Sequence, residues 1–318
     1  MTSLNRAYTR LSMRRRYEAW FLRFGLADGS GAWWFRYLLT NLGRSGGAGI
    51  PGAAPAQVWA TWFPRDAPPE TFIQEFSLDA LKLDARPGAS SSPFLIEIGP
   101  NRIEDSACRG AIEVRGQRIS WDLGYRSHFE VTFSNKGWIG FSRTPHSDGV
   151  FSGEIRFGGR VFRGDPLGAG VQGHNCGFRH RHYWTWMHAC FPQPDGSLST
   201  FEAMIYEMPL GLRFRKAILW HRGRAHVFRK LRESRRDRAG LRWTFQATSA
   251  AGSVEVDVDG GGVSLHRLPY VKTDCSGTFE VSNNSRARAQ LRLHLRDAEP
   301  PKQFTTEAGA VLEMTGDY

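Results

Sequence analysis

The sequence has few cysteines and no long apolar run, and both absences narrow the class of protein. Its four cysteines, Cys108, Cys176, Cys190 and Cys275, are far apart and form no C-x-x-C pair. This spacing argues against a disulfide framework or a zinc knuckle and favours free thiols in a reducing compartment. No segment approaches the roughly 20 consecutive apolar residues that a membrane-spanning helix needs. The basic N-terminus lacks the apolar core of a secretory signal, so we expect a soluble, cytoplasmic protein.

Acidic residues are outnumbered, with 31 Asp and Glu against 42 Lys and Arg, which gives a formal net charge of +11. The excess lies in the first 16 residues and in the stretch from Arg213 to Arg242. Such surfaces attract phosphates, and a weak contact with an anionic membrane surface is one expected partnership. No helix-turn-helix, RNA-recognition or zinc-finger pattern accompanies the arginines, so nucleic-acid binding is not expected. A solvated basic hairpin region is the simpler interpretation, and the sequence gives no oligomeric state.

Helical periodicity is almost absent, and period-two alternation takes its place. In residues 253–259 and 288–296, apolar side chains alternate with charged or polar ones, which is typical of half-buried antiparallel strands. Gly116 and Gly158-Gly159 are placed as hairpin turns, and the glycines at 260–262 are expected to return the chain as well. The sequence therefore predicts an all-β protein.

The length of 318 residues suits two domains better than one β-sandwich. The boundary is expected near residues 164–170 (GDPLGAG), which follow one hairpin and precede the segment richest in aromatic and polar residues. This divides the chain into a basic arm at 1–16, an N-terminal domain at 17–165 and a C-terminal domain at 166–318. Halves of similar length and strand content are compatible with two barrels.

Two generic motifs fail on their context. Residues 43–47 match G-x-S-x-G, but a nucleophile elbow needs a strand before it and a helix after it, and a Gly/Ala/Pro-rich loop follows here. Residues 168–173 match G-x-G-x-x-G, yet no helix follows that would present its N-terminus to a pyrophosphate. The sequence therefore supports neither a serine hydrolase nor a dinucleotide site.

Aromatic residues make up 13% of the chain, with 11 Trp and 21 Phe, and they concentrate beside histidines in residues 173–191. In a strand, Trp184, Trp186 and His188 share one face with His180 and His182. The H-x-H pair is an option for zinc, but no spacing supplies the remaining ligands, so we expect neither a metal nor another cofactor. Strand filling and hydrogen-bonded histidines inside a barrel are the plainer alternatives. A wall of a ligand pocket explains the concentration better.

Several segments together resemble a known superfamily. They are YEAWFLRF (17–24), WWFRYLL (33–39), VWATWF (58–63), ISWDLGY (119–125) and GHNCG (173–177). Their order and spacing are similar to those of the lipocalin-like carotenoid 1,2-hydratase (hydroxyneurosporene synthase) superfamily, which has tocopherol-cyclase-like and Diels-Alderase relatives. The resemblance spans most of the chain from Tyr17 onward. It implies two tandem lipocalin-like antiparallel β-barrels and an apolar ligand pocket.

The match is residue by residue at His174, Asn175 and Gly177. Many members carry an acidic residue before the His-Asn pair and a tryptophan after it, where this sequence has Gly173 and Cys176. An acid at that place is a candidate proton donor to an olefin, so its absence argues against a literal hydratase assignment.

Protonating an unactivated alkene requires a neutral carboxylic acid in an apolar pocket, with aromatic faces to stabilise the carbocation. The candidate acids with aromatic neighbours are Glu18, Asp122 and Glu202. Pairing with Arg23 or Arg36 would instead keep such an acid ionised and structural. A pericyclic reaction would need no strong acid, only a shaped cavity with one or two hydrogen-bond donors.

We expect catalytic roles for Asp122, Glu18, His174 and Asn175. Ligand-binding roles are expected for Trp20, Arg36, Trp59, Trp121, Tyr183, Trp184, Trp186, His188 and Glu202. In particular, His174, Trp184 and Trp121 are expected to border one cavity.

The predicted function is binding of an isoprenoid or polyketide-like molecule, with cofactor-independent hydration, cyclisation or isomerisation. A buried acid facing an apolar cavity favours this enzyme. An apolar cavity without a titratable wall group favours a lipid or pigment carrier, and filled barrel interiors favour a protein that acts through its basic surface.

Overall fold

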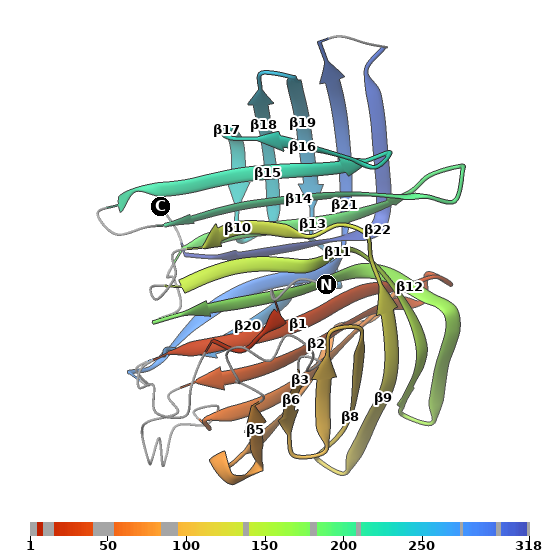
Figure 1. The fold of residues 1–318 in the computed structure, drawn as a ribbon, viewed down its shortest axis with the longest axis vertical. Coiled ribbons are helices and arrows are strands. Elements are labelled where there is room, and N and C mark those ends of the chain that lie inside the picture. Colours follow the sequence, from red (N-terminus) through yellow and green to blue (C-terminus); the bar gives the residue numbers. More distant parts are fainter. Residues whose placement is uncertain are drawn as a thin grey trace.

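The computed structural model describes residues 5–8, 16–40, 54–83, 95–135, 140–178, 183–207, 211–273, 276–296 and 300–316 (Figure 1). Regular structure in these ranges is predominantly β-strand, and a 3-10 turn lies at Leu78–Ala80. None of the described residues forms a helix with the length and apolarity that a membrane crossing requires. Residues 41–53, 179–182 and Cys275 lie outside the described residues.

The N-terminal half forms a 12-stranded antiparallel sheet. Its strands are β1 (Tyr17–Leu26), β2 (Gly31–Thr40), β3 (Ala56–Pro64), β4 (Glu70–Phe76), β5 (Leu81–Leu83), β6 (Leu95–Ile98), β7 (Asn101–Glu104), β8 (Ala107–Val114), β9 (Gln117–Arg126), β10 (Val131–Asn135), β11 (Gly140–Phe157) and β12 (Arg160–Gly177). The order is β4-β3-β2-β1-β12-β11-β9-β8-β7-β6-β5, and β10 pairs with β11. Because β4 also contacts β8, the sheet curls round into a barrel.

The C-terminal half forms a 10-stranded antiparallel sheet. Its strands are β13 (Trp184–Pro192), β14 (Leu198–Glu207), β15 (Arg213–His221), β16 (Arg224–Phe228), β17 (Lys230–Asp237), β18 (Arg242–Ser249), β19 (Gly252–Asp259), β20 (His266–Val271), β21 (Thr278–Leu295) and β22 (Lys302–Thr315). The order is β16-β15-β14-β13-β22-β21-β19-β18-β17, and β20 pairs with β21. The ends approach each other where β15 contacts β17. The predicted all-β architecture of two tandem barrels is confirmed.

The turns follow the glycines in two of three predicted places. Arg115 and Gly116 join β8 to β9, and Gly158 and Gly159 join β11 to β12, all with positive φ as a tight primed turn requires. The third prediction is wrong, because the chain after Asp259 does not return along β19. Instead β20 pairs with β21, while β19 lies between β18 and β21.

The domain boundary predicted between residues 165 and 166 falls inside β12. This strand stays paired with β1 and β11 as far as Gly177, and the second sheet begins at Trp184. The glycines at 164–170 therefore belong to a continuous strand, where several of them approach the neighbouring backbone closely. A Cβ on Gly168 or Gly170 would come within about 2 Å of a carbonyl oxygen of β1.

Each barrel has its own aromatic interior, and the two outer faces pack against each other. Along β1, Trp20, Leu22 and Phe24 face the first core, because alternate side chains of a strand point to opposite sides. Phe21, between them, packs outward against Trp186 of the second barrel. Further contacts of this kind join β2 and β3 to β20, and β10 to β15. Much of the outer face of each barrel is therefore buried.

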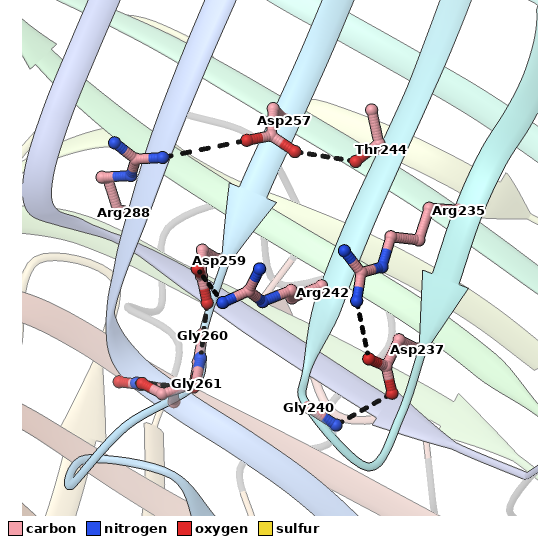
Figure 2. A network of polar contacts seen from close by, with 11 residues as sticks. Arg235, Asp237, Gly240, Arg242, Thr244, Asp257, Asp259, Gly260, Gly261 and Arg288 are labelled. Carbon is pink, nitrogen blue, oxygen red and sulfur yellow. Dashed lines mark hydrogen bonds and ion pairs between the residues drawn. The ribbon is translucent and has the colours of Figure 1, made fainter.

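The opposite, solvent-facing side of the second barrel carries a ladder of charged side chains (Figure 2). Arg242 pairs with Asp259 at 3.0 Å and Arg235 with Asp237 at 3.1 Å. Asp237 and Asp259 also accept hydrogen bonds from the backbone N–H groups of Gly240 and Gly261, both at 2.9 Å. These carboxylates hold the turns after β17 and β19. They also neutralise Arg235 and Arg242, near the end of the basic stretch from Arg213 to Arg242.

Arg23 connects the barrels at the centre of the interface. Its guanidinium, on β1, donates to the carbonyl oxygens of Gly309 (3.0 Å), Ala310 (2.7 Å) and Ser285 in β22 and β21. The side chain is fully buried and forms no ion pair with a described residue. Burial accordingly lowers its pKa to about 10. The three carbonyl groups lie near the place where the pairing of β21 with β22 shifts register. A cation from the first barrel thus supplies their hydrogen-bond donors.

We expect Arg23→Met to lower the free energy of unfolding by about 3 kcal/mol, because buried carbonyl groups would lose their donors. Urea unfolding followed by tryptophan fluorescence measures this. The control is Arg109→Met on the exposed face of β8, which should change the free energy by less than about 0.5 kcal/mol. Equal effects of the two variants would contradict the role assigned to Arg23.

Candidate active site between the two barrels

A pocket of about 320 Å³ lies where the outer faces of the barrels meet. A volume of this size lies at the lower end of the range that accommodates small organic ligands. The first barrel contributes Tyr17, Ala19, Phe21, Trp34, Arg36, Ser134, Gly140, Phe141, Ser142, Arg143, Thr144, Asn175, Cys176, Gly177 and Phe178. The second contributes Trp184, Trp186, Glu202, Met204, Tyr206, Tyr270 and Glu313. Nine of these 22 described residues are aromatic, and the two carboxylates among them come from the second barrel.

The two tryptophans of β13 face this pocket because of strand alternation. Thr185 and Met187 point toward the second barrel, while Trp184 and Trp186 project toward the first. Phe21 meets Trp186 edge to face, with ring centroids 5.4 Å apart. Trp184 and Trp186 thus lie on one strand face and line the pocket together, and their expected ligand-binding role stays a prediction.

Glu202 of β14 is the most enclosed acid of the pocket, with 2% of its surface exposed. Its Oε1 accepts hydrogen bonds from the Thr144 hydroxyl (2.8 Å) and the Trp186 indole N–H (2.9 Å). Its Oε2 is met by the Ser147 hydroxyl at 3.4 Å. Burial raises the pKa of Glu202 to about 7, against the lowering effect of these donors. The carboxyl group therefore keeps a substantial protonated fraction at neutral pH, and the weakly bonded Oε2 is the oxygen best placed to hold the proton.

Glu313 of β22 is a second acid of the same wall. It accepts hydrogen bonds from the Trp184 indole N–H (2.8 Å) and the Asn283 amide (3.2 Å). Burial raises its pKa, and the Arg36 guanidinium opposes that rise. Both acids line the pocket, but Glu313 is only partly buried, whereas Glu202 is buried. The sequence did not single it out, because Glu313 alternates with Leu312 and Met314 as a solvent-facing residue would.

The two acids flank β13 on one face of the sheet. Trp186 lies opposite Glu313 on one neighbouring strand, and His188 lies opposite Glu202 on the other. Glu202 and Glu313 are therefore two strand spacings apart across the sheet and two residues apart along it, which is roughly 12 Å between their backbones. Each is held by one indole of β13. This leaves room between them for a substrate beside the aromatic surface of Trp184 and Trp186.

Of the other predicted residues, Arg36 and Asn175 also line the pocket. The Arg36 guanidinium stacks between the rings of Trp59 (5.1 Å) and Tyr270 (4.4 Å). Trp59 thus supports the wall from behind and does not itself line the pocket. Tyr183 is buried beneath the guanidinium of Arg236, 4.3 Å from its ring centroid, and lies outside the lining as well.

His174 and Glu18 form a buried pair inside the first barrel, away from this pocket. Their side chains are 2.7 Å apart and both are inaccessible. His174 stacks on Trp20 at 4.4 Å, and the Tyr8 backbone N–H donates to Glu18 at 2.8 Å. The Trp20 indole donates to the Asn5 carbonyl at 2.9 Å. Residues 5–8 therefore cover this pair. Strand alternation in β1 and β12 points both side chains into the barrel.

Asp122 and Trp121 lie on opposite faces of β9, and neither reaches the pocket. The Asp122 side chain is 69% exposed and pairs with Arg109 at 2.9 Å. Trp121 is buried in the first core, where its indole N–H lies 3.2 Å from the Tyr37 hydroxyl. The prediction that His174, Trp184 and Trp121 border one cavity is therefore wrong. Trp121 is on β9, which pairs with β8 and β11, and strand alternation points both Trp121 and His174 into the first barrel.

His188 supports the pocket from below without lining it. Its Nε2 donates to the Ser147 carbonyl at 2.7 Å, which requires a proton on that nitrogen. Burial lowers the pKa of His188 to about 3, so the ring stays neutral. Because Ser147 also contacts Glu202, His188 fixes the backbone that places this hydroxyl.

Within the described ranges no group of three or more His, Cys, Asp or Glu side chains is arranged to hold a metal ion. His180 and His182, the pair considered for zinc, lie outside the described residues. The expectation that the protein needs no metal therefore stays a prediction.

No protein-family model matches the sequence, and no curated protein sequence is similar to it. Two solved structures share its fold over nearly the full length. Kievitone hydratase from Nectria haematococca aligns with a TM-score of 0.53 and 11% identity, covering 98% of this chain and 94% of that one. A protein assigned as AttH from Nitrosomonas europaea aligns with a TM-score of 0.54 and 11% identity, covering 95% and 93%. At this identity the likeness establishes the common fold.

The titration of Glu202 should be visible in the pH dependence of stability. Its pKa is raised in the folded protein from 4.5 to about 7, so the folded state binds the proton more tightly. The resulting stabilisation is full below the unfolded pKa and is lost as the pH rises toward about 7. We expect a loss of up to about 3 kcal/mol over this window.

Urea unfolding of the wild type and of Glu202→Gln across this pH range measures the difference. Comparing the two proteins removes the contributions of His188 and of other groups, which both retain. Glu255→Gln, an exposed acid on β19, is the matched control and should follow the wild type. Parallel curves for the wild type and Glu202→Gln would contradict the raised pKa.

Proposed function

We propose that this protein is a cofactor-independent enzyme that adds water to, or rearranges, an alkene of a hydrophobic small molecule in the pocket between the barrels. The observation that carries the proposal is Glu202, a carboxylic acid with a pKa near 7 beside the indole of Trp186. An acid of this strength inside an aromatic wall matches what protonation of an alkene needs.

The reaction balances with the residues of the wall. Glu202 transfers its proton to one alkene carbon as the π electrons form the new C–H bond, which leaves a carbocation at the other carbon. The faces of Trp184 and Trp186 stabilise that charge. A water molecule then bonds to the cation and releases a proton to a carboxylate. Without water, loss of a neighbouring proton would instead give an isomerised alkene.

Glu313 is the proposed acceptor for the proton that the water releases. It stands on the other side of β13 from Glu202, and its side chain is the more accessible of the two. Burial raises the pKa of Glu313, while Arg36 and the indole of Trp184 act in the opposite direction, toward its ionised form. Two carboxylates that differ in exposure and in charged neighbours can take separate acid and base roles.

The comparison supports the proposed reaction class without specifying the substrate. One of the solved structures that share the fold is a hydratase named for kievitone. The predicted substrates of this chain, isoprenoid or polyketide-like molecules, are compatible with an aromatic pocket of about 320 Å³. The barrel cores are packed with aromatic side chains, but Glu202 and Glu313 face the pocket outside them, which favours the enzyme over a protein acting through its surface alone.

Incubation with prenylated phenols and linear isoprenoid alkenes in D2O, followed by mass spectrometry, tests the proposal. We expect deuterium at carbon, with addition of D2O or with isomerisation. Glu202→Gln should lower kcat/KM at least about 100-fold, since it removes the proton donor. In the wild type, kcat/KM should fall above pH about 7, where Glu202 becomes ionised. The control Glu255→Gln should match the wild type.

Two outcomes would contradict the proposal. Turnover that survives in Glu202→Gln would remove that residue from the proton-donor role. Tight binding of the alkenes without any deuterium incorporation would identify the protein as a carrier with the same pocket.

A further inference from the structure

The pocket between the barrels reaches the surface at one end, where several strands begin or end. We call this end the pocket mouth. Tyr17, Gly177, Phe178 and Tyr206 line the pocket there. These residues lie where β1 begins and where β12 and β14 end, and β15 begins beside the end of β14. In Figure 1 these strand ends gather on the left of the molecule.

Large apolar side chains are exposed at the mouth. Phe178, which lines the pocket, is 41% exposed, and Leu212, directly before β15, is 59% exposed. Phe214 of β15 stacks on Tyr206 of the pocket wall, with ring centroids 4.8 Å apart. Leu212 is two residues before Phe214 and therefore lies close to the mouth. The other two strongly exposed apolar residues among those described, Val161 and Val263, lie away from the pocket lining.

Cations lie at the same strand ends. Arg213 and Arg215 begin β15 on the face opposite Phe214, and Arg215 is exposed. The Arg213 guanidinium lies 4.9 Å from the ring centroid of Tyr183, and Arg143 lines the pocket. Glu207, across from Arg213 in the strand register, is the acidic residue of this group. The mouth therefore combines a positive field with exposed apolar side chains.

We infer that the pocket mouth docks on an anionic bilayer surface, from which an apolar ligand passes into the pocket. Basic residues near anionic lipid contribute about 1 kcal/mol each, and apolar side chains that enter the headgroup region add to the attraction. A hydrophobic ligand concentrates in the same place. The transfer of substrate rests on the proposed function, whereas the docking rests only on the surface.

A polyanion such as RNA is the competing partner for basic residues. It would be held by phosphate contacts alone and would gain nothing from Leu212. The basic residues at the other end of the β15–β16 hairpin provide an internal comparison. Arg224 lies opposite His221, roughly 20 Å along the sheet from Arg215, and is equally exposed.

The test is co-sedimentation with vesicles of phosphatidylcholine alone and of phosphatidylcholine mixed with phosphatidylglycerol. The variant Leu212→Ser/Arg215→Gln removes one exposed apolar side chain and one cation from the mouth. The control Val161→Ser/Arg224→Gln removes the same kinds of side chain elsewhere. Melting temperatures of the variants close to that of the wild type establish that each one folds.

We expect the wild type to bind the mixed vesicles and to bind pure phosphatidylcholine at least tenfold less. The mouth variant should lose at least about fivefold in affinity for the mixed vesicles, and the control less than twofold. Equal losses in the two variants, no preference for anionic lipid, or tighter binding of an RNA oligomer than of the mixed vesicles at the same salt would overturn the inference.

This experiment separates the docking from the proposed reaction. Glu202→Gln should bind vesicles as the wild type does, because Glu202 is buried away from the mouth. Vesicle binding without any turnover would remove the reaction and leave the docking intact. Turnover without vesicle binding would remove the docking and leave the proposed reaction intact.

Discussion

The burial of the Arg23 guanidinium between the two barrels is the interaction on which the rest of the structure depends. A strand of the first barrel supplies the donors that three carbonyl groups of the second barrel need. The bonds to Ser285 and Ala310 are buried and the bond to Gly309 is partly buried, so loss of the Arg23 donors would leave carbonyl groups unpaired at the interface. The remaining residues of that face, including Phe21 and Trp34, then become buried wall instead of solvent-facing surface.

The pocket is a consequence of that association and not of either barrel alone. Glu202 and Glu313 stand on the outer face of the second barrel, where water would normally keep a carboxylate ionised. The first barrel removes this water and supplies Thr144, Ser147 and Arg36 as neighbours. The raised pKa of each acid is thus produced by the partner barrel. Acid chemistry and barrel docking are therefore coupled in this fold.

The sequence predicted the fold well because alternation and glycine turns are local signals. It also selected Trp184, Trp186 and Glu202, whose strands show an unusual mixture of acid and aromatic residues. It could not separate Glu202 from Asp122, since both follow an aromatic residue in an alternating strand, and one faces the partner barrel while the other faces water. Glu313 was missed for the same reason. Contacts between segments far apart in the sequence bury the outer face, and local alternation of side chains does not reveal such contacts.

The position of a bound apolar molecule tests the central claim most directly, because the claim is that the working cavity lies between the barrels. A crystal structure of the protein with a linear isoprenoid alkene would establish it. The account predicts density along Trp184 and Trp186, with an alkene carbon in contact with the Glu202 carboxyl group. Density inside the first barrel beside His174 and Glu18, with the space between the barrels unoccupied, would contradict it.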